Sequence, residues 1–150
     1  MPSIQIDLPL TVTASAKQAL AQRVGEIYAE IMQVGMDLLT VSVHDLGVGG
    51  VWRCHEAGPP TPSALIMCDI RGGRPVETRA RLARSLIDAC AGLLELDTVW
   101  VKVEFTQHSG DEMYHPHLGG FNDDWTGDER ITSAGPASAP AASAARSAVE

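Results

Sequence analysis

A strand–helix–strand pattern that occurs twice constrains the fold of this chain more than any other feature of its sequence. In the first occurrence, residues 3–8 alternate polar and apolar side chains, which is the period of a half-buried strand. Apolar residues spaced for one helix face follow, with Thr13 or Ser15 as candidate N-cap and an end expected near Gly35. Residues 39–44 alternate again and predict a second strand.

The second occurrence begins with residues 64–70, a mostly apolar run typical of a fully buried strand. The turn Arg71-Gly-Gly-Arg74 follows, and Pro75 suits the first position of a helix. Residues 99–105 predict the closing strand. The apolar face expected for the helix comprises Leu82, Leu86, Ile87, Cys90, Leu93 and Leu94.

These two units define the expected fold class, α/β with mixed (α+β) character. A helix between two strands favours parallel pairing of those strands, so each unit is a β-α-β repeat. We expect one four-stranded sheet with two helices on one face. The other face would be left open, and an apolar open face needs a partner, so we expect self-association. Residues 56–63 contain three prolines and are expected to be irregular.

Composition divides the chain into one domain and a tail. A length of 150 residues suits a single domain. Between residues 131 and 150, 15 of 20 residues are Ala, Ser, Pro or Gly. Such a segment buries too little apolar surface to offset the entropy of ordering it. We therefore expect a folded domain over residues 1–127 and a disordered Ala/Ser/Pro-rich tail over residues 128–150.

Charge and cysteine content exclude several classes of function. A net charge of −8 and a pI near 5.0 argue against a nucleic-acid partner and against a membrane surface. Three cysteines without C-x-x-C spacing argue against a disulfide framework and a zinc ribbon. No apolar run reaches the length of a membrane span and no signal peptide is visible, so we expect a cytoplasmic protein.

Pro2 is the first candidate for chemistry. Removal of Met1, which is common before a proline, would expose a rigid secondary amine. An α-amino group has an ordinary pKa of about 8, and burial and nearby arginines would lower that pKa toward neutrality. Such an amine suits general-base catalysis. The alternative is that Pro2 is idle, as in many chains that begin with Met-Pro.

The second candidate is the pair Arg71 and Arg74, which flank a glycine turn leading from a buried strand into a helix. A helix N-terminus favours anions, and a guanidinium can bind a carboxylate through two hydrogen bonds. In β-α-β sheets, ligands gather beyond the carboxyl ends of the strands, where this turn lies. The pair therefore predicts a site for a small carboxylate substrate, and the alternative is a solvated turn.

Together, the Met-Pro start, the duplicated β-α-β pattern and the strand–RGGR–helix turn resemble the tautomerase superfamily (4-oxalocrotonate tautomerase-like). Within it, the chain is most similar to the cis-3-chloroacrylic acid dehalogenase group. The resemblance implies a homotrimer, with Pro2 as the catalytic amine and Arg71 and Arg74 as ligands of the substrate carboxylate. The other segments that carry it are residues 15–17, 70 and 99–101.

The chain departs from that group at several site positions. Tyr28 stands on the first helix where the group has a histidine, and its hydroxyl could still donate a hydrogen bond to substrate. Lys102 stands where the group has a tyrosine. The group's water-activating Glu-Tyr pair corresponds here to Met113-Tyr114, with Glu112 one position away. Glu112 could serve only after a local shift, so the hydration machinery is doubtful.

A second relative within the superfamily shares other residues with this chain. Residues 123–125, Asp-Asp-Trp, resemble malonate semialdehyde decarboxylase, and Asp37 lies near the position of an aspartate of that enzyme. A loop or cap role explains Asp37 equally well. Histidines 115 and 117, with neighbouring acidic residues, match no zinc-ligand spacing, so we expect no metal. We also expect no cofactor.

The sequence therefore predicts an isomerase, a keto–enol tautomerase of a small α-keto or enol carboxylate. Pro2 would be the general base, and the arginine pair would hold the carboxylate and stabilise negative charge on the dienolate. One alternative is a cis-3-chloroacrylate dehalogenase-like hydratase or a malonate semialdehyde decarboxylase-like enzyme. Another is a non-catalytic trimeric binding protein. The candidate catalytic residues are Pro2, Arg71, Arg74, Tyr28, Glu112 and Tyr114.

Overall fold

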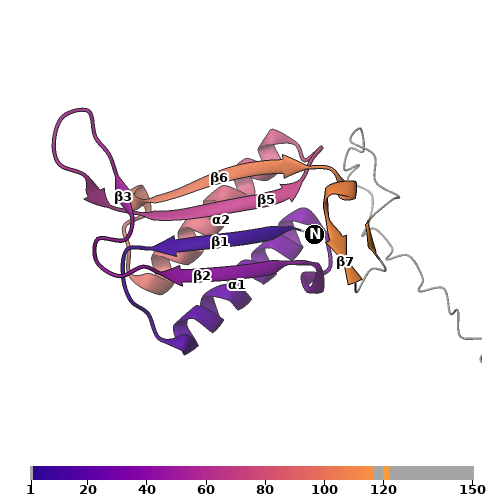
Figure 1. Ribbon diagram of the computed structural model, residues 1–150, viewed down its shortest axis with the longest axis horizontal. Helices are drawn as coiled ribbons and strands as arrows, with labels where there is room; N and C mark the ends of the chain where they lie inside the picture. The colour runs from indigo at the N-terminus through magenta and orange to yellow at the C-terminus, as the bar shows by residue number, and fades with distance from the viewer. Residues whose placement is uncertain (1, 117–119, 122–150) are drawn as a thin grey trace, which may run out of the picture.

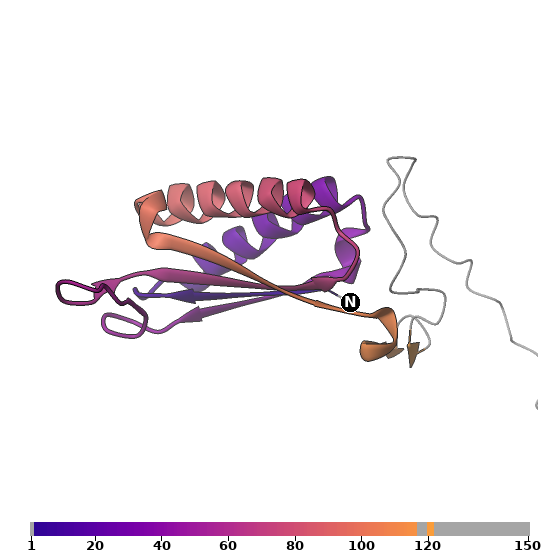
Figure 2. The same cartoon turned by 90° about the horizontal axis from the view of Figure 1, so that it is seen from above.

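The computed structural model describes residues 2–116 and 120–121. Within these residues, one four-stranded sheet is covered on one face by two long helices (Figures 1 and 2). This arrangement confirms the expected fold class. The strands are β1 (Ser3–Leu8), β2 (Thr40–Asp45), β5 (Ala64–Arg71) and β6 (Val101–His108), and the helices are α1 (Ala14–Met32) and α2 (Val76–Leu94).

The sheet is built from two parallel halves joined through an antiparallel centre. Its strand order is β2-β1-β5-β6, with β1 parallel to β2 and β5 parallel to β6. The central strands β1 and β5 are antiparallel, with Ser3 beside Asp69 and Asp7 beside Leu65. The carboxyl ends of β5 and β6 therefore lie beside the start of β1, which brings the N-terminus to the end of the sheet where the arginine turn follows β5 (Figure 1).

The core lies between the sheet and the two helices. Every second residue of β1 and β5 points toward the helices and is almost fully buried. Burying one such side chain stabilises the fold by about 1.5–3 kcal/mol. The prediction that residues 64–70 form a fully buried strand is wrong, because alternate residues of β5 are half-buried. Core residues include Ile4, Ile6, Leu8, Leu20, Val24, Ile66, Cys68, Ile70, Leu82, Leu86 and Cys90.

The face of the sheet away from the helices is mostly polar, which corrects the expectation of an apolar open face. The residues that alternate with the core positions are largely hydrophilic, and Leu65 and Met67 are the apolar residues among those of β5. Gln5 Nε2 donates to Asp7 Oδ1 over 3.0 Å, and Thr106 Oγ1 donates to Asp69 Oδ1 over 2.5 Å. Polar side chains on this face therefore form hydrogen bonds with one another within a single chain.

Several helix boundaries differ from the sequence prediction. Thr13 is the N-cap of α1, and its hydroxyl accepts a hydrogen bond from the Ala16 amide over 3.2 Å, as the capping pattern predicted. The helix ends at Met32 rather than near Gly35, because Gln33 adopts a left-handed conformation with φ of 54°. Pro75 is the residue before α2 and not its first helical residue.

The edges of the second half also differ from expectation. The closing strand begins at Val101, because the 3-10 helix η2 (Thr98–Trp100) precedes it. The segment expected to be irregular contains β4 (Thr61–Pro62), which pairs with β3 (Trp52–Arg53). On α2, Leu93 is 48% exposed and does not belong to the buried face, which uses Ala91 instead.

Four short elements complete the described chain. The 3-10 helix η1 (Met36–Leu38) precedes β2, and η3 (Gly110–Glu112) follows β6. Strand β7 (Tyr114–His115) pairs with β8 (Gly120–Phe121) beyond the end of the main sheet. No helix in residues 2–116 is long and apolar enough to cross a membrane.

Candidate active site

Pro2 and Arg71 lie at the same edge of the sheet. Pro2 is half-buried, and its carbonyl oxygen accepts a hydrogen bond from the amide of Thr40 over 3.2 Å. The next residue, Ser3, is the register partner of Asp69, two positions before Arg71 on the neighbouring strand. Neighbouring strands lie about 4.8 Å apart, so a small ligand held by Arg71 is within reach of the N-terminal segment.

The two arginines of the glycine turn have lowered pKa values. Burial, and to a smaller extent the nearby positive charge of Arg74, lower the pKa of Arg71 to about 10. Arg74 is 8% exposed, and burial also lowers its pKa. Both guanidiniums remain cationic at neutral pH, which is the state that binds a carboxylate. The turn between them includes Gly73 at φ of 82°, a conformation that favours glycine.

Arg74 also has a structural role that the sequence did not indicate. Its Nη1 donates a hydrogen bond to the carbonyl oxygen of Met32 over 3.1 Å. That carbonyl belongs to the last turn of α1, where cations are favoured by the helix dipole. The Nε of Arg74 is buried and has no hydrogen-bond partner among the described residues. Arg74 therefore joins the two halves of the chain while holding positive charge beside Arg71.

The start of α2 adds hydrogen-bond donors to this region. Pro75 is the N-cap residue of α2, and its side chain makes no hydrogen bond to the first backbone amides of the helix. Exposed amides and the positive end of the helix dipole favour an anion. The turn from Arg71 to α2 thus has the composition of a carboxylate-binding site.

Tyr28 belongs to the core beside the arginine pair. Its side chain is 1% exposed. Burial raises the pKa of the Tyr28 hydroxyl far above its ordinary value, and the charge of Arg74 opposes this shift in part. The hydroxyl is therefore protonated at neutral pH and can donate a hydrogen bond.

Glu112 and Tyr114 make their contacts with other residues than Pro2 and Arg71. Glu112 is exposed, and its Oε2 accepts hydrogen bonds from the Ser109 amide over 2.8 Å and from the Ser109 hydroxyl over 3.1 Å. Moving this carboxylate into the site would break that capping box. Tyr114 is 65% exposed and packs edge-on against Phe121, with ring centroids 5.1 Å apart.

Two further candidate residues lie at opposite ends of the sheet. Lys102 is the register partner of Leu65, at the opposite end of β5 from Arg71, and forms an ion pair with Glu104. Asp37 is exposed in η1, three positions before Thr40, so it lies near the edge that holds Pro2. Residues 117 and 123–125 lie outside the described part of the chain.

Sequence reasoning missed a hydrogen-bonded group on the polar face next to Arg71. His108 is the register partner of Arg71, and its Nδ1 lies 2.9 Å from Asp69 Oδ1. Thr106 Oγ1 donates to the same carboxylate oxygen. The alternation of residues 69 and 71 indicates a shared face, but the β5–β6 register that brings His108 there is a tertiary property.

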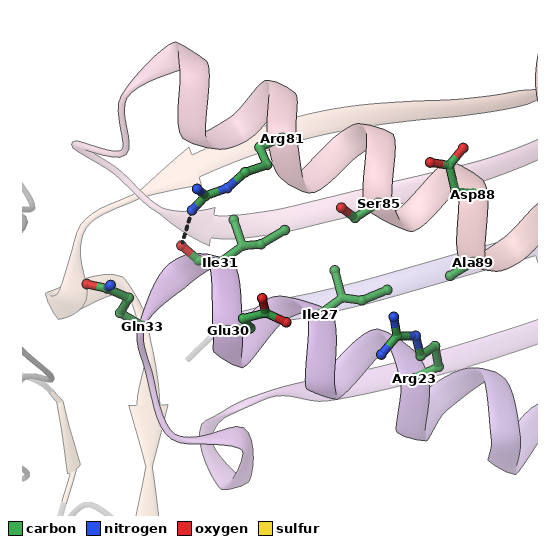
Figure 3. Close-up of a pocket in the computed structure, with 9 residues that line it drawn as sticks. All are labelled: Arg23, Ile27, Glu30, Ile31, Gln33, Arg81, Ser85, Asp88 and Ala89. Atoms are coloured by element: carbon green, nitrogen blue, oxygen red, sulfur yellow. Dashed lines mark hydrogen bonds between the residues drawn. The ribbon is translucent and has the colours of Figure 1, made fainter.

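An open groove of about 690 Å³ lies elsewhere, between the two helices. Figure 3 shows polar and charged side chains along the facing sides of α1 and α2, with Arg81 Nη2 donating to the Ile31 carbonyl over 3.4 Å. None of the six predicted catalytic residues lines this groove. Among residues 2–116 and 120–121, no three His, Cys, Asp or Glu side chains are grouped so as to hold a metal ion.

This fold is the one shared by structures of the tautomerase superfamily, so the resemblance inferred from the sequence is confirmed for the fold. No protein-family model matches the chain, and no curated protein matches it. One similar structure is N1, a member of the cis-3-chloroacrylic acid dehalogenase family. It is 23% identical over 75% of this chain and 79% of its own, with a TM-score of 0.66.

Two further structures have a TM-score of 0.68, and each is 21% identical over 79% of this chain and 94% of its own. One is Pt0534, whose crystal structure was obtained after inactivation by 2-oxo-3-pentynoate. The other is Q0 fused 4-OT, described as a symmetric trimer. At these identities the similarity establishes the fold, and the reaction has to be argued from the site.

Proposed function

We propose that this chain is a keto–enol tautomerase of a small α-keto or enol carboxylate, assembled as a homotrimer. The observation that carries the proposal is that Pro2, one residue before β1, and Arg71, the last residue of β5, lie at the same end of two adjacent antiparallel strands. After removal of Met1, neutral Pro2 takes a proton from the enol hydroxyl and returns it to the carbon next to the carbonyl. Arg71 and Arg74 hold the carboxylate and stabilise the dienolate.

The electrostatics of the site support this chemistry. An amine next to two guanidiniums has a lowered tendency to be protonated, which favours the basic form of Pro2 near neutral pH. The arginines supply preorganised positive charge where the dienolate forms, at no cost of reorganisation during the reaction. Glu112, the candidate for activating water, is engaged with Ser109, which favours proton transfer over hydration.

A decarboxylase is the second candidate function, and one observation favours it. Asp37 lies in η1 at the edge that holds Pro2, and it is exposed. An acidic side chain there could act on a three-carbon substrate whose carboxylate is held by the arginines. A non-catalytic trimeric binding protein is the third possibility, and retention of Met1 would favour it, because an acylated Pro2 nitrogen is not basic.

The experiment combines intact mass, kinetics and covalent labelling. Mass spectrometry establishes whether Met1 is absent, and phenylenolpyruvate reports tautomerisation as a function of pH. 2-Oxo-3-pentynoate, the inactivator of Pt0534, is an electrophile that a neutral amine can add to. We expect one label on Pro2, loss of labelling and of activity in Pro2→Ala, and an unchanged oligomeric mass in that variant.

The control separates the site from the fold. Ser3→Ala alters the neighbouring residue and leaves the amine and the arginines in place, so labelling and turnover should persist. Retained Met1, or equal inactivity of wild type and Pro2→Ala on enol, haloacrylate and semialdehyde substrates, would contradict a catalytic role. Decarboxylation of malonate semialdehyde that depends on Asp37 would instead favour the second candidate function.

A further inference from the structure

The polar face of the sheet carries two histidine–aspartate pairs with the same geometry. His108 Nδ1 lies 2.9 Å from Asp69 Oδ1, and His44 Nδ1 lies 2.9 Å from Asp7 Oδ1. Their surroundings differ, because the His108 side chain is 16% exposed and the His44 side chain is 45% exposed. Of the two pairs, the one at His108 lies at the edge of the sheet that holds Pro2.

The His108 ring is held in one orientation. The Asp69 carboxylate accepts a hydrogen bond from the N–H at Nδ1 of His108. Thr106 Oγ1 donates a hydrogen bond to the same carboxylate and holds the carboxylate in place. A carboxylate on one ring nitrogen sets the tautomer and leaves the other nitrogen to accept or donate a proton. That nitrogen, Nε2, lies 2.7 Å from the sulfur of Met113, which is a weak acceptor on a flexible side chain.

The strand register places this ring across the arginine from Pro2. Arg71 lies on β5, with the N-terminal segment on the neighbouring β1 and His108 as its register partner on β6. Each neighbouring strand is about 4.8 Å away, so a substrate carboxylate held at the end of β5 has an acid–base group on either side.

We propose that His108 is a second acid–base catalyst of the Pro2 site, with Asp69 as its positioning residue; this rests on the proposed tautomerase function. In the enol-to-keto direction, neutral Pro2 accepts the enol hydroxyl proton while protonated His108 donates its Nε2 proton to the carbon. The O–H bond and the Nε2–H bond break, the C–H bond and a Pro2 N–H bond form, and C=C–OH becomes HC–C=O. Water then removes the proton from Pro2 and returns one to His108.

The two-residue reaction has a distinct pH dependence. It requires neutral Pro2 and protonated His108, so kcat/KM rises as Pro2 loses its proton and falls as His108 loses its own, whereas a single Pro2 base gives a rise alone. The charged groups next to His108 are Asp69, which bonds its ring, and Arg71, its register partner on β5. Glu112 of η3 is bonded to the next residue, Ser109. A descending limb that belongs to His108 must therefore persist in Glu112→Gln.

The experiment compares His108→Gln with His44→Gln in the full chain. We expect His108→Gln to lower kcat on phenylenolpyruvate about 100-fold with a small change in KM, and to remove the descending limb of the profile. His44→Gln should retain both limbs, because its pair lies five register positions away from the site edge. Pro2 should still be labelled by 2-oxo-3-pentynoate in both variants, which shows that the site is folded.

A second variant keeps the proposal testable if His108→Gln does not fold. Asp69→Asn retains the size of the side chain and removes the carboxylate, so it should lower kcat and displace the descending limb without abolishing it. Full activity with both limbs in a folded His108→Gln would overturn the inference and leave the tautomerase proposal intact. A wild-type protein that is neither labelled nor active would overturn the tautomerase proposal, and the role of His108 with it.

Discussion

Arg74 and Met32 join the two β-α-β halves through one buried hydrogen bond, from the guanidinium Nη1 to the last helical carbonyl of α1. The bond makes the candidate carboxylate site part of the folded framework. Arg74 provides positive charge for a ligand and also caps the C-terminal end of α1. Its replacement should therefore affect stability as well as catalysis. Arg71, half-buried on the strand, should affect mainly the ligand.

Arg74→Met should lower the free energy of unfolding by about 1–3 kcal/mol, because the Met32 carbonyl would lose a buried partner. Urea denaturation of the unliganded protein measures this effect. Arg81→Met is the matched control, since Arg81 makes a longer bond of 3.4 Å to the Ile31 carbonyl from a more exposed position, and it should cost less. Equal losses in the two variants would contradict the anchoring role of Arg74.

Carboxylate binding should weaken as the pH rises through about 10. The pKa of Arg71 is lowered to about 10, so its guanidinium is charged below that pH and loses its charge above it. Calorimetry with phenyllactate, a carboxylate that cannot enolise, measures the affinity in a Pro2→Ala background free of the amine's titration. The Kd should rise about tenfold between about pH 8.5 and pH 11, and Arg71→Gln should bind weakly with a flat profile.

The three cysteines should differ in reactivity. Burial raises the pKa of the Cys68 thiol to about 12 and that of Cys90 to about 11, whereas Cys54 is exposed. The thiolate is the reactive form, so a thiol reagent at about pH 8 should modify one cysteine quickly and the other two on unfolding. Mass spectrometry of Cys54→Ser provides the control, since that variant should remain unmodified while folded.

The N-cap of α1 should contribute measurably to stability. Thr13→Ala removes the side-chain acceptor for the Ala16 amide and should cost about 1 kcal/mol in the free energy of unfolding. Ser15→Ala is the control, because Ser15 lies within the first turn and bonds the Thr13 hydroxyl instead of a backbone amide. A larger loss in Ser15→Ala, measured by thermal or urea unfolding, would show that Thr13 is not the effective cap.

The order of elements could be predicted from the sequence because it depends on local periodicity. The alternation of Ile4, Ile6 and Leu8 and the helical spacing of Leu82 and Leu86 fix elements whose buried sides the structure confirms. Boundaries were less predictable. A left-handed conformation at Gln33 ends α1 early, although glutamine carries no general signal for it, and the antiparallel pairing of β1 with β5 depends on contacts far apart in sequence.

The candidate site was predictable in part for the same reason. Pro2 and the arginine turn carry local signals, whereas the proximity of the two depends on the central strand pair. The polar character of the open face was not predicted, because it depends on how residues such as Asp69 and Thr106 pair across neighbouring strands. Their hydrogen bond exists across the β5–β6 register.

Each half of the fold has an equivalent turn from a strand into a helix, and in the first half an ion pair lies at this turn. At the end of β2, the Asp45 carboxylate accepts hydrogen bonds from Lys17 of α1 and from the Val12 amide over 3.5 Å. The charges of Asp45 and Lys17 therefore neutralise each other at the turn of the first half. The corresponding turn of the second half, between β5 and α2, has Arg71 and Arg74 instead. A duplicated architecture with room for two ligands per chain is thus asymmetric in charge, and titration should give a stoichiometry of one carboxylate per polypeptide.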